Sequence, residues 1–154
     1  MNTKPVFILA AVLLSPLATA IGQSRLGTSL PPWADSALVR AGVGSRYELA
    51  SRLNPGEQYG DFDGDGFTDL AVPVVETATR KHGLAIVHRV DQATYILAAG
   101  EPLGAGEDDF SWLTGWGVDR LRSHRDAIRV DRPGHPSAWA VWNGQSYSWV
   151  ENPE

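Results

Sequence analysis

Hydrophobic and polar residues along the chain predict one short helix followed by a series of short strands. Residues 34–41 (ADSALVRA) start with an acidic turn and are followed by Gly42, which is typical of a short amphipathic helix. Short runs rich in branched and aromatic residues predict strands over residues 47–53, 70–75, 84–90, 93–98 and 127–130. The fold is therefore expected to be mainly β (α+β), a small antiparallel domain with one short N-terminal helix.

Turn-forming residues and proline predict how these strands are connected. Asn143-Gly144 lies between the runs 138–142 and 145–150 and predicts a β-hairpin, because both residues of the tightest hairpin turn need positive φ. Pro73 has no amide hydrogen to donate, so its strand is expected at a sheet edge or at a bulge. Residues 100–117 are rich in glycine without a clear period, and we expect one long loop there.

The first twenty residues have the pattern of a secretory signal peptide. Lys4 precedes an apolar core over residues 6–14, and a small-residue cleavage site ends at Ala20. The apolar core is too short for a membrane-spanning helix, which needs roughly 20 apolar residues. We therefore expect cleavage after Ala20 and a periplasmic or secreted protein that has no membrane segment once residues 1–20 are removed.

Beyond the signal peptide, the chain divides into a leader and one domain. Residues 21–32 are small, polar and end in two prolines, as expected of a flexible leader. Residues 33–154 have the length of a single β-rich domain. The formal net charge of −5 argues against a nucleic-acid partner, because nucleic acids select basic surfaces. The chain has no cysteine, so stability is expected from packing and bound metal instead of disulfides.

The clearest chemical feature is the Asp- and Gly-rich run DFDGDGFTD over residues 61–69. Numbered from Asp61, carboxylates fall at positions 1, 3, 5 and 9, and Gly66 at position 6 permits a sharp turn. Calcium takes six to eight oxygen ligands in flexible loops of this kind. Two carboxylates about 5 Å apart repel by roughly 3 kcal/mol at an effective dielectric near 20, so the curled loop needs a cation. The alternative is a solvated turn without metal.

The type of calcium loop follows from its flanks. An EF-hand needs a Glu at position 12 and a helix on each side, whereas position 12 is Val72 and the flanks are predicted strands. Residues 60–72 (GDFDGDGFTDLAV) resemble instead the calcium loops of FG-GAP and VCBS-type repeats, which lie in integrin-like β-propellers. The resemblance implies Ca²⁺ bound by the side chains of Asp61, Asp63, Asp65 and Asp69 and by the carbonyl of Phe67. A propeller needs about four to eight blades, and one copy of the motif predicts a single strand-loop-strand site in a smaller fold.

A second set of candidate residues combines acids and tryptophans. Acids beside aromatic rings occur in glycosidase sites and on sugar-binding surfaces, and an exposed tryptophan is also a common contact for a protein partner. The alternative is a solvated acidic loop whose aromatic residues pack in the core. The candidate binding residues are Glu107, Asp108, Asp109, Trp112 and Trp142.

No catalytic constellation is recognisable in the sequence. The four histidines lack zinc-ligand spacing, and neither a nucleophile elbow nor a phosphate-binding loop is present. We therefore expect an exported, non-catalytic binding or interaction protein with a structural calcium ion, for instance a periplasmic inhibitor or immunity factor with an unknown protein partner. The alternative is a cell-envelope carbohydrate-binding module or glycan-active enzyme, whose partner would be an envelope glycan.

Overall fold

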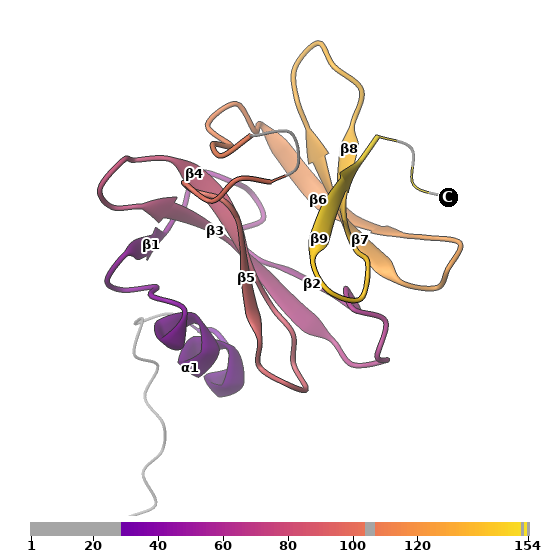
Figure 1. Ribbon diagram of the computed structural model, residues 1–154, viewed down its shortest axis with the longest axis horizontal. Helices are drawn as coiled ribbons and strands as arrows, with labels where there is room; N and C mark the ends of the chain where they lie inside the picture. Colours follow the sequence, from indigo (N-terminus) through magenta and orange to yellow (C-terminus); the bar gives the residue numbers. More distant parts are fainter. Residues whose placement is uncertain (1–28, 104–106, 152, 154) are drawn as a thin grey trace, which may run out of the picture.

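A computed structural model describes residues 29–103, 107–151 and 153. In this part of the chain, one helix precedes nine strands, which form two open antiparallel sheets (Figure 1). The expected fold class, mainly β with one short N-terminal helix and no propeller, is confirmed. The predicted signal peptide and residues 21–28 of the predicted leader lie outside the described residues.

The elements follow one another along the chain in a simple order. The helix is α1 (Pro32–Arg40), and the strands are β1 (Tyr47–Leu49), β2 (Gln58–Gly60), β3 (Asp69–Glu76), β4 (His82–Val87), β5 (Thr94–Ala98), β6 (Gly115–Arg120), β7 (Asp126–Asp131), β8 (Ala138–Trp142) and β9 (Tyr147–Val150). The first sheet has the order β1-β3-β4-β5, and β2 also pairs with β3. The second sheet is a meander in the order β6-β7-β8-β9.

The first sheet is covered on both faces, and its central strands are apolar for that reason. Alternate residues of β3, Leu70 and Val72, pack with α1, whereas Ala71 packs with the second sheet. Successive side chains of a strand point to opposite faces, so every residue of β3 is buried. The helix, the first sheet and the second sheet therefore form three layers with a hydrophobic core on each side of the first sheet (Figure 1).

The helix begins slightly earlier than predicted. Proline is favoured in the first turn of a helix, where its missing N–H has no partner to lose, and α1 begins at Pro32. Leu30 is buried in the core between α1 and the first sheet. The packed structure therefore includes residues that precede the expected boundary at Trp33.

Pro73 lies in an interior strand, so the expectation of an edge strand is wrong. β1 pairs with residues 74–76 of β3 and β2 pairs with residues 69–71, which leaves a gap beside Pro73. The Pro73 carbonyl points toward this gap and accepts a hydrogen bond from the Ala50 amide (2.9 Å). The nitrogen of a strand residue points to the same side as its carbonyl, so the missing N–H costs no strand pairing.

The second sheet contains one strand that the sequence pattern missed and one hairpin that it predicted. Residues 115–120 form β6, so the expected loop over residues 100–117 ends earlier. Pairing with β7 and burial of Trp116 (5% exposed) offset the low strand propensity of the two glycines. The predicted hairpin of β8 and β9 is present, but its loop has four residues, because Trp142 pairs with Tyr147.

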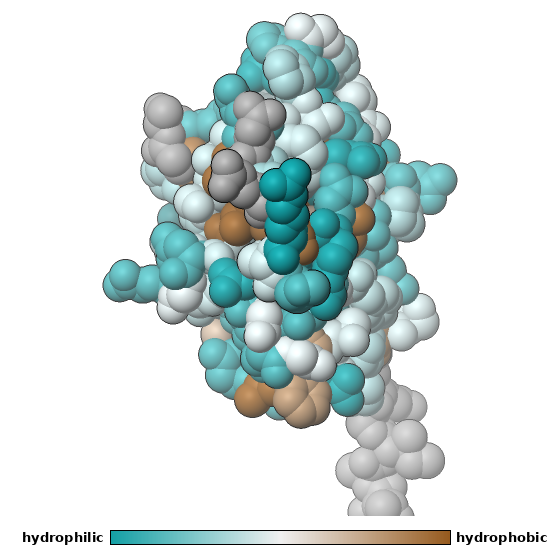
Figure 2. All heavy atoms as spheres, turned by 90° about the vertical axis from the view of Figure 1, so that its right-hand side faces the viewer, coloured by the Kyte–Doolittle hydropathy of each residue, from teal (hydrophilic) through white to brown (hydrophobic). Residues whose placement is uncertain are grey.

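Seen from the side of the second sheet, the surface is mostly hydrophilic, with apolar areas in small separate groups (Figure 2). Among the described residues, the exposed large hydrophobic side chains are Tyr59, Phe67 and Val90. None of the helical segments in this part of the chain has the length and apolar character needed to cross a membrane.

Two glycine substitutions test the close packing of β4 on β5. A Cβ atom at Gly83 would lie 2.7 Å from the Ala99 nitrogen, whereas a Cβ atom at Gly56 would meet nothing within 4 Å. We expect Gly83→Ala to lower the free energy of unfolding by about 3 kcal/mol. Gly56→Ala should leave it unchanged or raise it slightly. Urea denaturation measures both, and equal effects of the two substitutions would contradict the described register of β4 and β5.

Candidate metal centre

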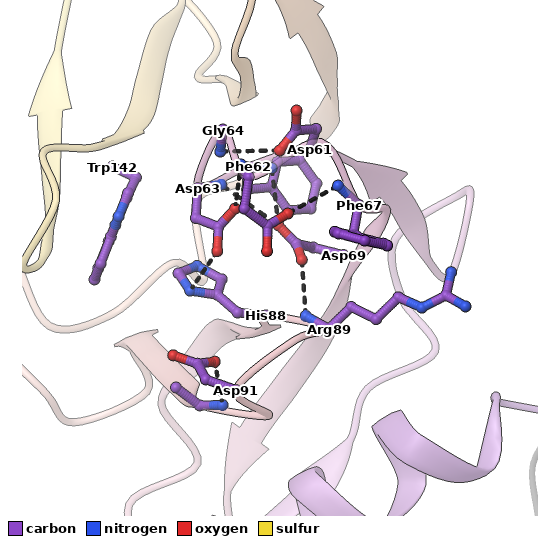
Figure 3. Close-up of polar contacts among 12 residues, drawn as sticks. Asp61, Phe62, Asp63, Gly64, Phe67, Asp69, His88, Arg89, Asp91 and Trp142 are labelled. Carbon is purple, nitrogen blue, oxygen red and sulfur yellow. Dashed lines mark hydrogen bonds and ion pairs between the residues drawn. The ribbon is translucent and has the colours of Figure 1, made fainter.

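The Asp-rich loop leads from β2 into β3 and curls around its own carboxylates (Figure 3). Gly64 and Gly66 have positive φ values of 83° and 88°, which L-residues with side chains rarely adopt. The Asp61 carboxylate accepts hydrogen bonds from the amides of these two glycines, at 2.9 Å and 3.2 Å. Carboxylate oxygens of Asp61, Asp63 and Asp65 lie within 4.8 Å of one another. The predicted clustering of these three side chains is therefore observed.

Asp69, at the ninth position of the loop, is completely buried. Its Oδ2 accepts hydrogen bonds from the amides of Phe62 (2.9 Å) and Asp63 (3.4 Å), and its Oδ1 accepts one from the Arg89 amide (2.8 Å). Burial raises the pKa of Asp69 to about 6, and the neighbouring Asp63 acts in the same direction. The backbone hydrogen bonds act in the opposite direction. Asp69 therefore ties the loop to the segment that follows β4.

His88 joins the site from the end of β4, and the sequence analysis did not place it there. Its Nδ1 lies 3.4 Å from Asp63 Oδ2, and ligand atoms of His88, Asp63 and Asp69 lie within 4.8 Å of one another. His88 is only 2% exposed, and this burial lowers its pKa. Leu70 pairs with Val87, and the next antiparallel pair along that register is Asp69 with His88. This register is a property of the folded chain, so no local sequence pattern indicated it.

The loop also contacts the second sheet. The Asp61 amide donates a hydrogen bond to Asp126 Oδ2 (2.8 Å), and the Asp126 amide donates one to the Asp61 carbonyl (2.9 Å). His88 Nε2 lies 2.7 Å from the hydroxyl oxygen of Tyr147, the first residue of β9. The loop and His88 therefore contact residues of the second sheet. These contacts depend on how the two sheets pack.

The spacing of these acidic groups is compatible with one bound cation. Calcium–oxygen distances are about 2.3–2.6 Å, so two oxygens on one ion lie at most about 5 Å apart. The oxygens of Asp61, Asp63 and Asp65 lie within 4.8 Å of one another and so meet this condition. Burial raises the pKa of Asp63, which indicates that its negative charge is poorly solvated without a cation. These acidic groups could therefore hold a metal ion.

The second candidate set is only partly brought together by the fold. Glu107 and Trp112 line a cavity of about 160 Å³. Asp108 instead forms an ion pair with Lys81, and Asp109 accepts hydrogen bonds from the amides of His82 and Ser111 (both 2.9 Å). Trp142 does not line this cavity and packs instead in an aromatic cluster with His88, Tyr95 and Tyr147.

The geometry of Trp112 further limits sugar binding at this cavity. The Arg132 guanidinium lies 5.0 Å from the centre of the Trp112 ring, and it pairs with Glu107 at 3.1 Å. A sugar normally stacks on the open face of an aromatic ring. Here that face and the nearby acid already have a partner within the chain.

Comparison with models of protein families, with curated proteins and with solved structures finds no match to this chain.

Replacing Asp69 tests its role as the anchor of the loop in the absence of metal. Asp69→Ala removes the acceptor for three backbone amides, and an unsatisfied buried donor costs about 1–3 kcal/mol. We expect the free energy of unfolding in the presence of chelator to fall by about 3 kcal/mol or more. Asp65→Ala is the matched control, because Asp65 is exposed and accepts one amide, that of Phe67. Equal losses for both variants, measured by denaturant unfolding, would contradict this role.

Proposed function

We propose that this chain is an exported, non-catalytic interaction protein in which one calcium ion stabilises the loop over residues 61–69. The observation that carries the proposal is the convergence of the Asp61, Asp63 and Asp65 carboxylates in a loop that contacts both sheets. The loop lies between β2 and β3, a strand-loop-strand setting that agrees with its resemblance to FG-GAP and VCBS-type calcium loops.

The Asp61, Asp63 and Asp65 carboxylates suit calcium better than they suit other common cations. Its candidate ligands are carboxylate oxygens together with the Phe67 carbonyl, and calcium prefers hard oxygen ligands in flexible loops. Magnesium requires a smaller, near-ideal octahedron and retains several waters. A cation of charge +2 would also offset the mutual repulsion of the clustered carboxylates.

A structural role for calcium follows from the position of the loop. Without a cation, the repelling carboxylates favour an open loop, and opening would disturb the hydrogen bonds between Asp61 and Asp126. These bonds join the first sheet to the second. The chain has no cysteine and cannot form a disulfide. A bound ion would instead cross-link the loop and add its binding free energy to the stability of the folded domain.

An interaction role is favoured over a glycan-directed role by the surroundings of the second candidate set. Glu107 and Trp112 are engaged by Arg132, and Asp108 and Asp109 have separate partners. A periplasmic inhibitor or immunity factor remains the proposed type of interaction protein, with a protein as its partner.

Calcium should raise the melting temperature of the purified protein. For a dissociation constant of about 10⁻⁴ M, 1 mM free calcium stabilises the folded state by about 1.4 kcal/mol. This corresponds to a rise of about 4–6 °C for a domain of this size. Asp63→Ala should abolish the rise, because Asp63 belongs to the acidic cluster.

The control for this experiment is Glu48→Ala, which removes an exposed carboxylate that pairs with Arg80 on the surface. This variant should keep the full response to calcium. If wild-type protein contained no calcium in metal analysis, and chelation left its melting temperature unchanged, the calcium proposal would be wrong.

The interaction role is tested by capturing partners from the cell envelope. The tagged protein should retain a specific protein in the presence of calcium, and Asp63→Ala should retain less of it because the loop is no longer ordered by the ion. Retention on immobilised envelope glycan, without any protein partner, would instead support the carbohydrate-binding alternative.

A further inference from the structure

His88 differs from every other group in the candidate metal centre. It supplies nitrogen instead of oxygen, and it follows β4 instead of lying in the loop; like Asp69 it is buried, with 2% of its surface exposed. The outer acidic group consists of Asp61, Asp63 and Asp65, whereas His88 forms an inner group with Asp63 and Asp69. The two groups share Asp63.

The two oxygens of Asp63 serve the two groups separately. Oδ1 accepts a hydrogen bond from the Asp65 amide within the loop (3.0 Å), while Oδ2 lies 3.4 Å from His88 Nδ1. Two ligands bound tetrahedrally at about 2.0–2.1 Å from one zinc ion lie about 3.4 Å apart. The separation of Nδ1 and Oδ2 therefore matches that of two ligands on a single small cation (Figure 3).

The other groups around the imidazole resemble the outer shell of a metal-bound histidine. A ligating histidine usually donates its second ring N–H to an oxygen, which fixes the ring and leaves the other nitrogen for the metal. His88 Nε2 lies 2.7 Å from the Tyr147 hydroxyl oxygen. When Nε2 carries the proton and donates to this oxygen, the lone pair of Nδ1 faces Asp63, and a cation between them replaces repulsion by attraction.

Asp69 and the aromatic residues complete this inner group. Asp69 accepts three backbone hydrogen bonds, as ligating carboxylates generally do. The ring centres of Tyr95 and Trp142 lie 4.8 Å and 4.9 Å from that of the imidazole ring. These rings limit the access of water to the inner group.

We infer that His88, Asp63 and Asp69 form a second metal position, which binds a divalent transition-metal ion of the zinc type on the inner side of the calcium loop. One imidazole, two carboxylates and a water make a four-coordinate set that suits zinc. Calcium prefers oxygen and would occupy the outer group. The inference rests on the proposed calcium loop in one respect, because both positions use Asp63.

The direct test is a zinc titration of the calcium-saturated protein, followed by ¹H–¹⁵N spectra of the imidazole nitrogens. One equivalent of Zn²⁺ should shift the Nδ1 resonance of His88 and leave its Nε2 protonated. His88→Gln identifies the resonances, and the spectra of the wild-type protein decide the result even if this variant folds poorly. An unchanged His88 ring, with shifts confined to other histidines, would overturn the inference.

Variants separate the two metal positions. His88→Gln should weaken zinc binding by more than about 100-fold and calcium binding by much less, whereas Asp61→Ala should weaken calcium binding by more than it weakens zinc binding. Tyr147→Phe should weaken zinc binding by about 10-fold, since it removes the partner of Nε2. His135→Gln is the matched control, because His135 is exposed on the turn between β7 and β8.

The outcomes distinguish failure of this inference from failure of the proposed function. Simple competition, in which calcium displaces zinc in proportion to its concentration, would overturn the second position. Zinc coordination by His88 Nδ1 in a protein that binds no calcium would support the inner position and reject the calcium proposal. Calcium binding without zinc coordination would do the reverse.

Discussion

Asp69 holds a carboxylate with no exposed surface at the point where the Asp-rich loop, β3 and the end of β4 meet. Burying such a charge is unfavourable unless it is hydrogen-bonded or paired. The amides of Phe62, Asp63 and Arg89 all donate to it, so its two oxygens hold the start of the loop and the segment after β4 in one arrangement. The curled shape of the loop, and with it the convergence of the outer carboxylates, depends on this anchor.

The same loop contributes polar contacts to the interface between the two sheets. Most of that interface is hydrophobic, with Leu84 and Ile86 of the first sheet in one cluster with Ile128 of the second. Hydrophobic contacts are not directional, whereas the hydrogen bonds between Asp61 and Asp126 require one relative position. A cation in the loop would therefore act on the packing of the sheets as well as on the loop.

The polar groups around the Asp-rich loop differ in kind from those around Trp112. Around the loop, unlike ligand types are brought together from distant segments, and burial shifts the pKa values of Asp69 upward and of His88 downward. Around Trp112, by contrast, charged groups are already paired within the chain. The acidic groups of the loop could hold a metal ion, whereas the charged groups around the Trp112 cavity are paired with one another.

Much of the fold and the outer part of the site could be predicted from sequence, because they depend on neighbouring residues. The period of the apolar residues predicts α1 and most strands, and the Asp and Gly spacing predicts the curl of residues 61–69. The interior place of Pro73 could not be predicted, because it depends on the gap between β1 and β2. The glycine-rich strand β6 likewise depends on pairing with β7.

The inner part of the site was decided by tertiary structure alone. His88 reaches Asp63 through the pairing of β3 and β4, and its partner Tyr147 lies 59 positions further along the chain. Asp126 contacts Asp61 across 65 positions. Local patterns carry no information about contacts at such separations, because these depend on which faces of the two sheets pack together. The sequence by itself determined a loop able to attract a cation, and the packing of the sheets decided which further side chains surround it.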